Sequence, residues 1–422
     1  MRVLWFSVSP ISLEEDNNKG KNGVGWIHSL LLIASKIENL EIGIVYANYL
    51  ADRKDNEIQG NVRIFPINVN RNSVRQKLRD AITYKVIDEL LIRESLRIIH
   101  DYKPSLIQVF GSEWCFGLLS EYIDIPIIIH MQGFWPQIRN ARKLIWKFLF
   151  LNELRSGLLF HPITLLVDNV FSHFLSRERQ EREQKILHIN HFFMCRTRWD
   201  KAIVRLYNEN AQIFHVDEAL RPEFLLNQRK WKHGNDNIVL ITTGICSYKG
   251  TDVALKAAQL ICENTKYKVV WKWIGGDNKN LRPFELLTGI KGKDVGIVMK
   301  GRLNATQILE ELLTSEIYVH LSYTDNSPNA VCEAQYLGMP VIATNVGGIP
   351  SLFDEEYDKD LLVPINDPYY LASKIVHLYE NIDEQNRLSD LNWNISHKRH
   401  AEQNIMKQLM QAYLDVINYA KV

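Results

Sequence analysis

Two carboxylate residues, Asp325 and Glu333, are separated by seven residues in the stretch DNSPNAVCEAQYLGMPVIATNVGGIP. Ser327 and Pro328 between them predict the start of a helix, because serine caps helices and proline suits the first helical turn. A helix that begins at about Asn329 would end at the glycine of the following LGMP segment. We therefore expect Asp325 just before the helix N-terminus, and Glu333 facing outward about one turn into the helix.

The start of this predicted helix has the chemistry of an anion site. Its first N–H groups have no partner within the helix, and the helix dipole places partial positive charge there. We therefore expect donor contacts, those of a diphosphate among them, at Ser327, Asn329, Ala330 and Val331. A carboxylate accepts two hydrogen bonds at once, which suits neighbouring hydroxyls of a ribose or hexose. The stretch predicts a nucleotide-sugar site; the alternative is a packed helix beside a solvated carboxylate.

The same stretch resembles the E-x7-E signature of retaining nucleotide-sugar glycosyltransferases of family 4, which have the GT-B fold. The continuation A-x-x-x-G-x-P-V-I-A-T-x-V-G-G-I-P is similar to that of the family. The resemblance implies that Glu333 binds the ribose of the donor and that Asp325 is a catalytic-site residue near the hydroxyls of the donor sugar. This chain departs from the signature at Asp325, where aspartate is one methylene shorter than glutamate.

A second motif implied by the resemblance follows a predicted strand at 238–243. Gly244 opens a loop that leads to Lys249 and a helix over 253–262, similar to the family's G-R-L-x-x-x-K-G donor-phosphate loop. Lys249 matches the lysine that neutralises the donor diphosphate, and we count it among the catalytic residues. The family's arginine is missing, so leaving-group stabilisation would depend more on helix N-termini or on Arg302. The loop near Gly301 is expected to hold the nucleobase, mostly through its backbone.

The N-terminal half begins like a Rossmann unit. A buried strand over 3–8 is followed by a loop with Gly23 and Gly25 and by a helical run over 27–37. The resemblance implies that this glycine loop helps to hold the acceptor and the donor phosphate. The alternative is a plain glycine turn.

Three further candidates stand where predicted strands end, the place where open parallel sheets bind ligands. Glu113 follows a strand at 106–110, His130 ends a strand at 125–130, and Arg196 follows a strand at 191–195. His130 resembles a catalytic-site histidine that reaches the donor sugar, and Arg196 could bind an anionic acceptor or phosphate. We group Glu113 with the loop residues that are expected to bind the acceptor or a phosphate. The alternative for each is an ordinary packing or surface role.

Composition narrows the class of protein. The chain has 422 residues, 46% of them hydrophobic, which indicates two domains with sizeable cores. Lysine and arginine number 50 against 49 acidic residues, so bulk charge gives no reason to expect nucleic acid. Five cysteines without a CxxC pair indicate a reducing compartment and neither a disulfide framework nor a zinc site. No signal peptide or membrane span is apparent, and we expect a cytoplasmic protein.

The fold class that follows is α/β, a GT-B fold of two Rossmann-like, doubly wound parallel-sheet domains that face each other across a cleft. The predicted domains are residues 1–227, which bind the acceptor, and 228–402, which bind the donor. A polar linker occupies the start of the second domain, and a final helix over about 403–422 is expected to pack back on the first.

Two charged segments have open interpretations. Residues 139–149 carry four basic and no acidic side chains, typical either of a core helix with a solvated cationic face or of peripheral contact with the inner face of the plasma membrane. The run over 177–185 mixes both signs of charge and predicts a solvated helix.

The sequence thus predicts a retaining, metal-independent hexosyltransferase without a cofactor. It would move a sugar from a nucleoside diphosphate sugar, UDP-sugar first, to a hydroxyl of a glycan or lipid-linked glycan in bacterial surface polysaccharide synthesis. An inactive nucleotide-sugar-binding subunit and a GT-B epimerase are the alternatives. Turnover of the donor separates the first alternative from the enzyme.

Overall fold

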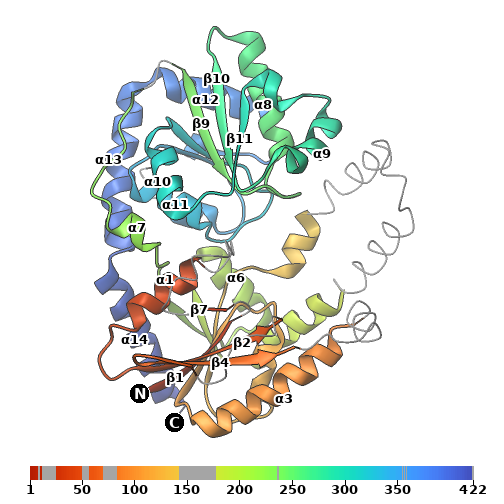
Figure 1. Cartoon of the computed structure of the whole chain (residues 1–422), viewed down its shortest axis with the longest axis vertical. Helices are drawn as coiled ribbons and strands as arrows, with labels where there is room; N and C mark the ends of the chain where they lie inside the picture. The colour runs from red at the N-terminus through yellow and green to blue at the C-terminus, as the bar shows by residue number, and fades with distance from the viewer. Residues whose placement is uncertain are drawn as a thin grey trace. The chain divides into compact units, whose positions relative to one another are not determined.

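The computed structural model describes residues 1–7, 10–11, 25–49, 57–69, 83–141, 177–234, 237–353, 355, 357 and 359–420. Contacts divide them into two compact units (Figure 1). The first unit takes described residues of Met1–Pro136, Pro162–Ala219 and His400–Val422. The second takes those of Gln137–His161 and Leu220–Arg399. The chain therefore enters the second unit at Leu220, before the polar linker predicted at 228–237.

The first unit contains a sheet of eight strands in the order β3-β4-β2-β1-β5-β6-β7-β8. Its strands are β1 (Arg2–Ser7), β2 (Glu41–Asn48), β3 (Glu57–Gln59), β4 (Val62–Asn68), β5 (Leu106–Phe110), β6 (Ile127–His130), β7 (Phe192–Cys195) and β8 (Gln212–His215). Its helices are α1 (Gly25–Ala34), α3 (Lys85–Tyr102), the 3-10 helix η1 (Cys115–Glu121), α6 (Arg198–Tyr207) and α14 (Glu402–Tyr419), and residues 177–189 are also helical. Every neighbouring pair of strands is parallel except β3 with β4, which is antiparallel.

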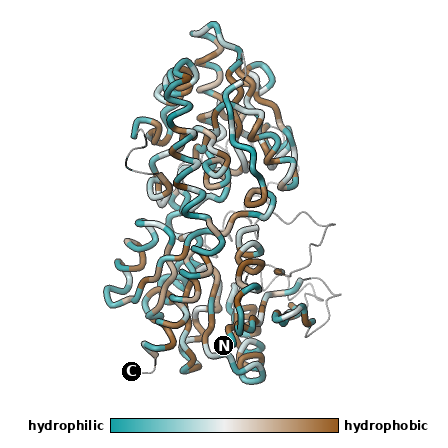
Figure 2. Tube along the Cα trace, turned by 90° about the vertical axis from the view of Figure 1, so that its left-hand side faces the viewer, coloured by the Kyte–Doolittle hydropathy of each residue, from teal (hydrophilic) through white to brown (hydrophobic). Residues whose placement is uncertain are grey.

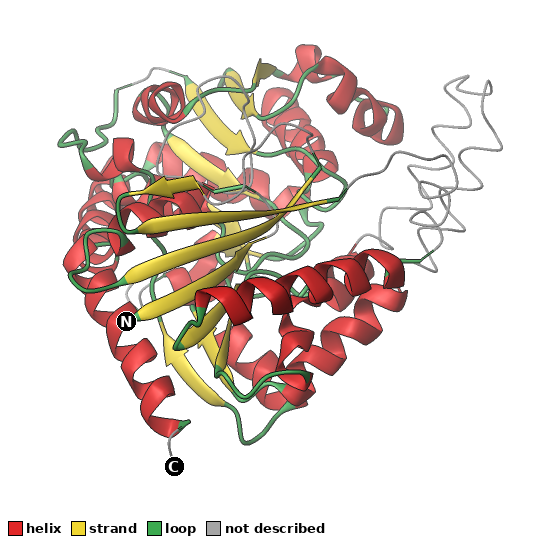
Figure 3. Cartoon of the chain, turned by 60° about the horizontal axis from the view of Figure 1, so that its bottom comes forward, coloured by secondary structure: helices red, strands yellow, loops and turns green. Residues whose placement is uncertain are grey.

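Strand β1 shows how the sequence builds this sheet. Its side chains alternate between two cores, because successive residues of a strand point to opposite faces. Val3 and Trp5 pack in a cluster with residues of α1 and α14, whereas Leu4 and Phe6 pack in a cluster with residues of α3 and η1. Both faces are buried, so the strand appears in the sequence as an unbroken apolar run. Helices cover both faces of the sheet (Figure 3).

The second unit contains a parallel sheet of six strands in the order β11-β10-β9-β12-β13-β14. Its strands are β9 (Ile238–Thr243), β10 (Val269–Ile274), β11 (Ile297–Gly301), β12 (Ile317–His320), β13 (Val341–Thr344) and β14 (Leu362–Val363). Its helices are α7 (Pro222–Leu225), α8 (Thr251–Asn264), α9 (Asn278–Thr288), α10 (Ala305–Leu313), α11 (Asn329–Tyr336), α12 (Pro368–Glu380) and α13 (Ile382–Arg399), with 3-10 turns η2 (Gly292–Val295), η3 (Ile349–Leu352) and η4 (Lys359–Leu361).

Both sheets have the doubly wound order. Numbered along the second unit alone, its strands run 3-2-1-4-5-6, and the parallel strands of the first unit repeat that order with one strand more. In such sheets the strand order reverses between the first and fourth strands, and ligands bind outside the carboxyl ends there. The predicted fold class of two Rossmann-like parallel-sheet domains is confirmed. The reversal points lie between β1 and β5 and between β9 and β12.

The helices bury one face each. Along α14 the buried residues recur at three- and four-residue spacing, at Ile405, Leu409, Tyr413 and Val416 among others. Hydrophobic and hydrophilic residues accordingly alternate along the helical turns (Figure 2). The buried face of α14 packs in the same cluster as Trp5 of β1. The final helix is thus part of the first unit.

Candidate functional site

Asp325 lies at the reversal point of the second sheet. Strand β12 ends at His320, and the loop that follows carries Asp325 before α11 begins at Asn329. Lys249 lies in the loop after β9, the neighbouring strand. The sheet topology therefore brings together two predicted catalytic residues that are 76 positions apart in the chain.

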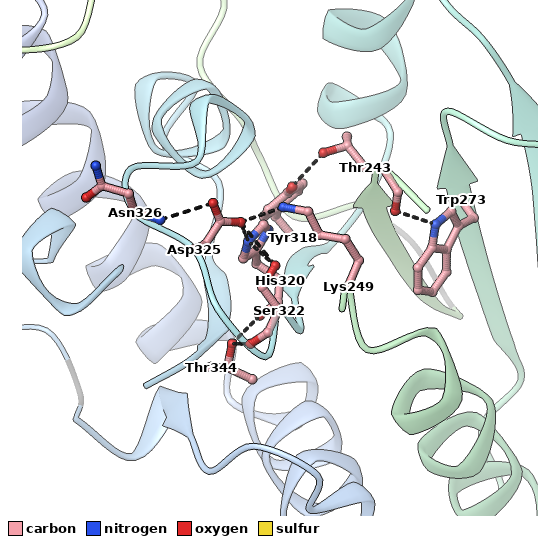
Figure 4. Close-up of polar contacts among 10 residues, drawn as sticks. Thr243, Lys249, Trp273, Tyr318, His320, Ser322, Asp325, Asn326 and Thr344 are labelled. Carbon is pink, nitrogen blue, oxygen red and sulfur yellow. Dashed lines mark hydrogen bonds and ion pairs between the residues drawn. The ribbon is translucent and has the colours of Figure 1, made fainter. Parts of the chain in front are cut away.

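The carboxylate of Asp325 accepts hydrogen bonds from several donors (Figure 4). Its Oδ2 accepts hydrogen bonds from Lys249 Nζ at 2.5 Å, from His320 Nε2 at 2.9 Å and from Ser322 Oγ at 3.1 Å. Its Oδ1 accepts from the backbone N–H of Asn326 at 3.1 Å. Burial alone would raise the pKa of Asp325, but Lys249 and His320 overcome that effect and hold this pKa well below its usual range. Asp325 is therefore ionised at neutral pH.

The lysine loop is fixed to the sheet by its glycine. Gly250 has φ +68°, and a Cβ placed there would lie 2.1 Å from the carbonyl oxygen of Leu321. The backbone of Tyr323 donates to the carbonyl of Tyr248 at 2.7 Å, so the loop and the end of β12 are joined directly. Only glycine allows this close approach, which sets Lys249 beside Asp325.

A second glycine turn supports Asp325 from the other side. Gly347 has φ +53°, and an added Cβ would lie 1.9 Å from the carbonyl oxygen of Asp325. Gly348 donates its N–H to that same oxygen at 3.1 Å. The turn at Gly347 and Gly348 therefore holds the backbone of the candidate catalytic carboxylate.

Glycines also end the three neighbouring strands β9, β10 and β11. Gly244 donates its N–H to Ile274 at 2.8 Å, and Gly275 donates to Gly301 at 2.7 Å. The indole of Trp273 donates to the carbonyl of Gly244 at 2.9 Å. All three glycines have positive φ, and no atom of the described residues lies within 4 Å of a Cβ placed at Gly244 or Gly301. The two predicted donor-binding glycines thus lie at one edge of the sheet with space beside their backbones.

The prediction that Glu333 faces outward is wrong. Glu333 is only 3% exposed, and both of its carboxylate oxygens accept hydrogen bonds from Arg221, at 2.6 Å and 2.7 Å. A buried carboxylate needs such a partner, because an unpaired charge away from water is costly. The partner lies 112 positions away in the chain, so local spacing could not indicate that the side chain turns inward.

The start of α11 also differs in detail from the prediction. Pro328, not Ser327, occupies the N-cap position, and no side chain caps the helix. Proline has no N–H to satisfy, which suits this position. Asn329 and Ala330 are half-buried at the helix start, whereas Val331 is buried and donates its N–H to the carbonyl of Pro328 at 2.9 Å.

In the first unit, the predicted site residues have varied environments. Gly23 lies outside the described residues, and Gly25 is the first residue of α1. Glu113 follows β5 and accepts a hydrogen bond from the backbone N–H of Gly133 at 2.9 Å. Burial raises the pKa of Glu113. His130 ends β6 and is fully buried.

Arg196 has several internal contacts. Its guanidinium donates to Glu218 at 2.9 Å and to the carbonyl of Met131 at 3.2 Å, and it lies 4.6 Å from the ring centre of Trp26. The side chain is only 5% exposed. An anion bound by Arg196 would therefore have to share it with Glu218.

The expectation of a fully solvated helix at 177–185 is wrong in its middle. Arg182 donates to both carboxylate oxygens of Asp88 at 2.8 Å and 2.7 Å, and Glu183 is fully buried. Glu183 accepts hydrogen bonds from Ser112 Oγ at 2.6 Å and from the backbone of Trp135 at 2.8 Å. Burial, and then the nearby charge of Glu113, raise the pKa of Glu183 to about 8.

We predict that this buried acid makes stability fall with rising pH. The folded pKa of Glu183, about 8, lies above the ordinary value of 4.5, so the folded state holds the proton more tightly. Its contribution to stability is complete below the unfolded pKa and is lost as pH rises through the folded pKa. Replacing Glu183 by glutamine should remove this dependence. Urea unfolding gives the free energy of unfolding of each protein. The difference in this free energy between the wild type and Glu183→Gln should change by on the order of 2 kcal/mol from pH 5 to pH 8.5. Parallel pH profiles of the two proteins would contradict this prediction.

Much of the basic segment lies outside the described residues, which stop at Ala141 and resume at Arg177. Residues 142–149, and with them most of the predicted membrane contact, are therefore not placed. Within the parts of the chain that the structure describes, no helix has the length and apolarity to cross a bilayer. In the same parts, no group of three or more His, Cys, Asp and Glu side chains is arranged to hold a metal ion.

Two residues that contact predicted site residues of the second unit were not predicted. His320 ends β12 and bonds to Asp325, and the strand-end rule that singled out His130 applies to it equally. Burial lowers the pKa of His320, so the ring is neutral. Arg221, in the segment before α7, contacts Glu333, a partner 112 positions away in the chain.

Comparison with known proteins agrees with this geometry. Residues 225–391 match the family model described as "Glycosyl transferases group 1". A Bacillus subtilis (strain 168) protein, TuaC, whose name assigns it to teichuronic acid biosynthesis as a glycosyltransferase, is 35% identical over 86 residues, 20% of this chain and 21% of that protein. The chain spans less than a third of the length of the curated relatives that it matches.

Solved structures share the fold over nearly the whole chain. Sucrose-phosphate synthase from Thermosynechococcus elongatus superimposes with a TM-score of 0.71 at 14% identity, covering 99% of each chain. HepE of Anabaena in complex with UDP and glucose superimposes with a TM-score of 0.64 at 13% identity, covering 98% of this chain and 100% of that one. The chain thus has the fold of GT-B glycosyltransferases, and the family match supports a glycosyltransferase.

Proposed function

We propose that this protein is a retaining glycosyltransferase that transfers a sugar from a nucleoside diphosphate sugar, UDP-sugar first, to an acceptor hydroxyl. The observation that carries the proposal is the ion pair of Lys249 with Asp325 at the reversal point of the second sheet, followed along the chain by the Arg221-bound Glu333 on α11. Support comes from the family match over the same residues and from HepE, a protein of the same fold that was solved with UDP and glucose.

The proposed donor site has separate parts for each chemical group. Glu333, held by Arg221, has lone pairs on both oxygens that remain for ribose hydroxyls. The loop edges at Gly244 and Gly301 offer backbone groups to the base and phosphates. The start of α11 and Lys249 supply positive charge for the diphosphate.

Lys249 changes partner in the proposed reaction. Without donor its ammonium neutralises Asp325, at 2.5 Å. When a donor binds, the ammonium is shared with the diphosphate, and Asp325 accepts from a hydroxyl of the sugar. Breaking the bond between the anomeric carbon and the phosphate oxygen places negative charge on the diphosphate. Lys249 therefore binds the transition state more tightly than the ground state.

The proposed reaction uses no nucleophile from the protein, so the face of attack by the acceptor decides the anomeric configuration of the product. The acceptor oxygen attacks the anomeric carbon on the face from which the diphosphate departs. Its proton passes to a leaving phosphate oxygen, and the new bond keeps the anomeric configuration. Neither a metal ion nor a cofactor takes part in these steps.

The proposed setting is the cytoplasm at the inner face of the plasma membrane. Support comes from the sequence, in which the five cysteines form no CxxC pair. The acceptor class, a glycan or lipid-linked glycan of a bacterial surface polysaccharide, is supported by the name of the Bacillus relative.

The test is a transfer assay read by proton NMR of the anomeric signal, with purified protein, a UDP-sugar and short glycan acceptors. Asp325→Asn serves as the matched inactive variant, because it keeps the shape and removes the charge. The proposal expects a product with the donor's anomeric configuration. An inverted product would refute the retaining mechanism. Donor that binds but is never consumed, by transfer or hydrolysis, would favour an inactive binding subunit, and a change of sugar stereochemistry without transfer would favour an epimerase.

A further inference from the structure

His320 binds the same carboxylate oxygen as Lys249. It is the last residue of β12 and is only 2% exposed. Its Nε2 lies 2.9 Å from Oδ2 of Asp325 and 3.0 Å from Oγ of Ser322 (Figure 4). Lys249 Nζ lies 2.5 Å from that same Oδ2. One oxygen of the candidate catalytic carboxylate therefore has an ammonium and an imidazole as partners, and all of these residues belong to the second unit.

The position of the ring proton follows from the charge of the carboxylate. Asp325 is ionised, so its oxygens can only accept hydrogen bonds. The proton on Nε2 of His320 therefore points at Oδ2, and Nδ1 of the neutral ring carries no proton. A second proton would enter at Nδ1. It would make the ring a cation without breaking the bond to Asp325.

Two charged groups act on this ring, and their effects oppose each other. Burial lowers the pKa of His320, the hydrogen bond to Asp325 raises it, and the charge of Lys249 lowers it further. Without donor, the ammonium and the carboxylate are paired directly, so little net charge lies beside the ring. The neutral ring is the result of this pairing as well as of burial.

Other titratable groups near the ring do not change this balance. The phenol of Tyr318, stacked on the ring with centroids 6.3 Å apart, keeps its proton because burial raises its pKa. Glu333 of α11, which packs against β12, has Arg221 as its own partner. On the loop after β9, Cys246 and Tyr248 act on the ammonium rather than on the ring. The adjacent strands β9 and β13 bring threonine hydroxyls to this part of β12.

A bound donor would upset the balance. In the proposed reaction the ammonium of Lys249 is shared with the diphosphate, which brings negative charge of its own. The ring of His320 then lies beside Asp325 with less of the opposing ammonium. Excess negative charge nearby favours the protonated form of an imidazole. A bond from a charged ring to a carboxylate is also stronger than one from a neutral ring.

We propose that His320 is a positioning residue that takes up a proton from solvent, at Nδ1, when the donor binds, and so replaces Lys249 as the cationic partner of Asp325. The charged ring keeps the carboxylate ionised and in place to accept from the sugar, while the ammonium serves the diphosphate. Donor binding is then tighter at lower pH. The proton uptake rests on the proposed function, whereas the response of the ring to the charge of Lys249 does not.

That response can be measured without donor. Protein labelled with ¹⁵N-histidine gives ring nitrogen shifts that report tautomer and charge, and loss of one signal set in His320→Gln or His320→Asn assigns the residue. In the wild type we expect a neutral ring with the proton on Nε2 above pH 7. Lys249→Met should move the midpoint of its titration up by at least about one pH unit, because a nearby positive charge is removed.

The matched control for these spectra is Lys256→Met, which removes an exposed lysine of α8. It should leave the titration of His320 unchanged. A ring that titrates in Lys249→Met as it does in the wild type, or a wild-type ring with its proton on Nδ1, would overturn the inference.

Calorimetry with UDP-glucose tests the proton uptake. Titrations at pH 7 in buffers of different ionisation enthalpy give the number of protons taken up per donor bound. Both phosphates of UDP-glucose are diesters and lack the proton that a phosphate monoester titrates near neutral pH, so the protons exchanged belong to the protein. We expect the wild type to take up about half a proton or more. Its Kd should accordingly rise about 3-fold or more from pH 6.5 to pH 7.5.

His320→Gln is the variant that separates positioning from plain structure. Glutamine keeps an N–H for Asp325 but cannot take up a proton. Its proton uptake should be close to zero and its Kd nearly independent of pH, with the largest loss of affinity relative to the wild type at low pH. Equal proton uptake in the two proteins, or none in the wild type, would overturn the inference. If the variant does not fold, the wild-type uptake and the Lys249→Met spectrum decide.

The two measurements distinguish this inference from the proposed function. UDP-glucose that binds without proton uptake would refute the inference and leave the donor site standing. UDP-glucose that fails to bind would count against the proposed function. In that case a raised titration of His320 in Lys249→Met would still support the coupling between the two side chains, and an unchanged titration would refute it.

Discussion

Replacing Lys249 by methionine is expected to lower kcat for sugar transfer about 100-fold, the size of effect found when one preorganised donor to a developing charge is removed. The side chain lies in a loop that Gly250 fixes against β12, so its ammonium is already in place before the donor arrives. Methionine keeps an unbranched side chain of similar length and removes the ammonium, with its charge and its hydrogen-bond donors. Transfer rates at saturating donor give the measurement.

The matched control is Lys256→Met, a lysine of the same unit that is exposed on α8. It should change kcat by less than about 2-fold. Thermal unfolding of both variants shows whether they are folded. A Lys249→Met protein that is folded and keeps at least a third of the wild-type kcat would contradict the assigned role of the ammonium.

Replacing Gly347 by alanine is expected to destabilise the second unit by about 3 kcal/mol. A left-handed backbone conformation costs a non-glycine residue about 1–2 kcal/mol, and forcing atoms into a packed region adds a similar amount. Here the added methyl would meet the backbone of Asp325 at 1.9 Å, and backbone cannot move aside as a flexible side chain can. Urea unfolding measures the loss. Because Asp325 must shift, donor binding should weaken as well.

Gly289→Ala separates the two causes. Gly289 has φ +74° at the end of α9, but within the described part of the chain no atom lies within 4 Å of an added Cβ. Its replacement should therefore cost only the conformational part, about 1 kcal/mol, and leave donor binding unchanged. Equal losses in the two variants would show that the contact between Gly347 and Asp325 does not matter.

The strands could be predicted from the sequence because parallel sheets leave a simple pattern. Strands buried on both faces, such as β1 and β9, appear as continuous apolar runs bounded by loop residues. Alternation with helices then favours the doubly wound order, which the structure confirms. The edge strand β3 was not predicted, since its three residues are mostly exposed and carry no such pattern.

Helix α13 shows why other elements were missed. Its buried face carries Gln385, Ser389, Asn392 and Ser396 beside a single leucine, so the apolar periodicity that indicates a helix is absent. One of them, Asn392, donates to the carbonyl of Met339 at 2.8 Å, 53 positions away in the chain. Such pairings depend on the tertiary fold and leave no local trace.

The candidate site was likewise predictable only in part. Lys249 and Asp325 were predicted from motifs, and the topology places them in contact. Arg221, the partner of Glu333, lies 112 positions away from it in the chain. Spacing along the chain cannot reveal contacts of that kind.

Donor binding tests the central claim most directly. Thermal unfolding would be followed with UDP-, GDP-, ADP- and dTDP-sugars, without added metal, for the wild type, Glu333→Ala and the exposed control Glu310→Ala. A ligand at 100 times its dissociation constant stabilises the folded state by about 2.7 kcal/mol. We expect one base to raise the wild-type and Glu310→Ala midpoints and to leave that of Glu333→Ala unchanged from its own ligand-free value. No shift with any nucleotide sugar would contradict the assignment of the second unit as a donor site.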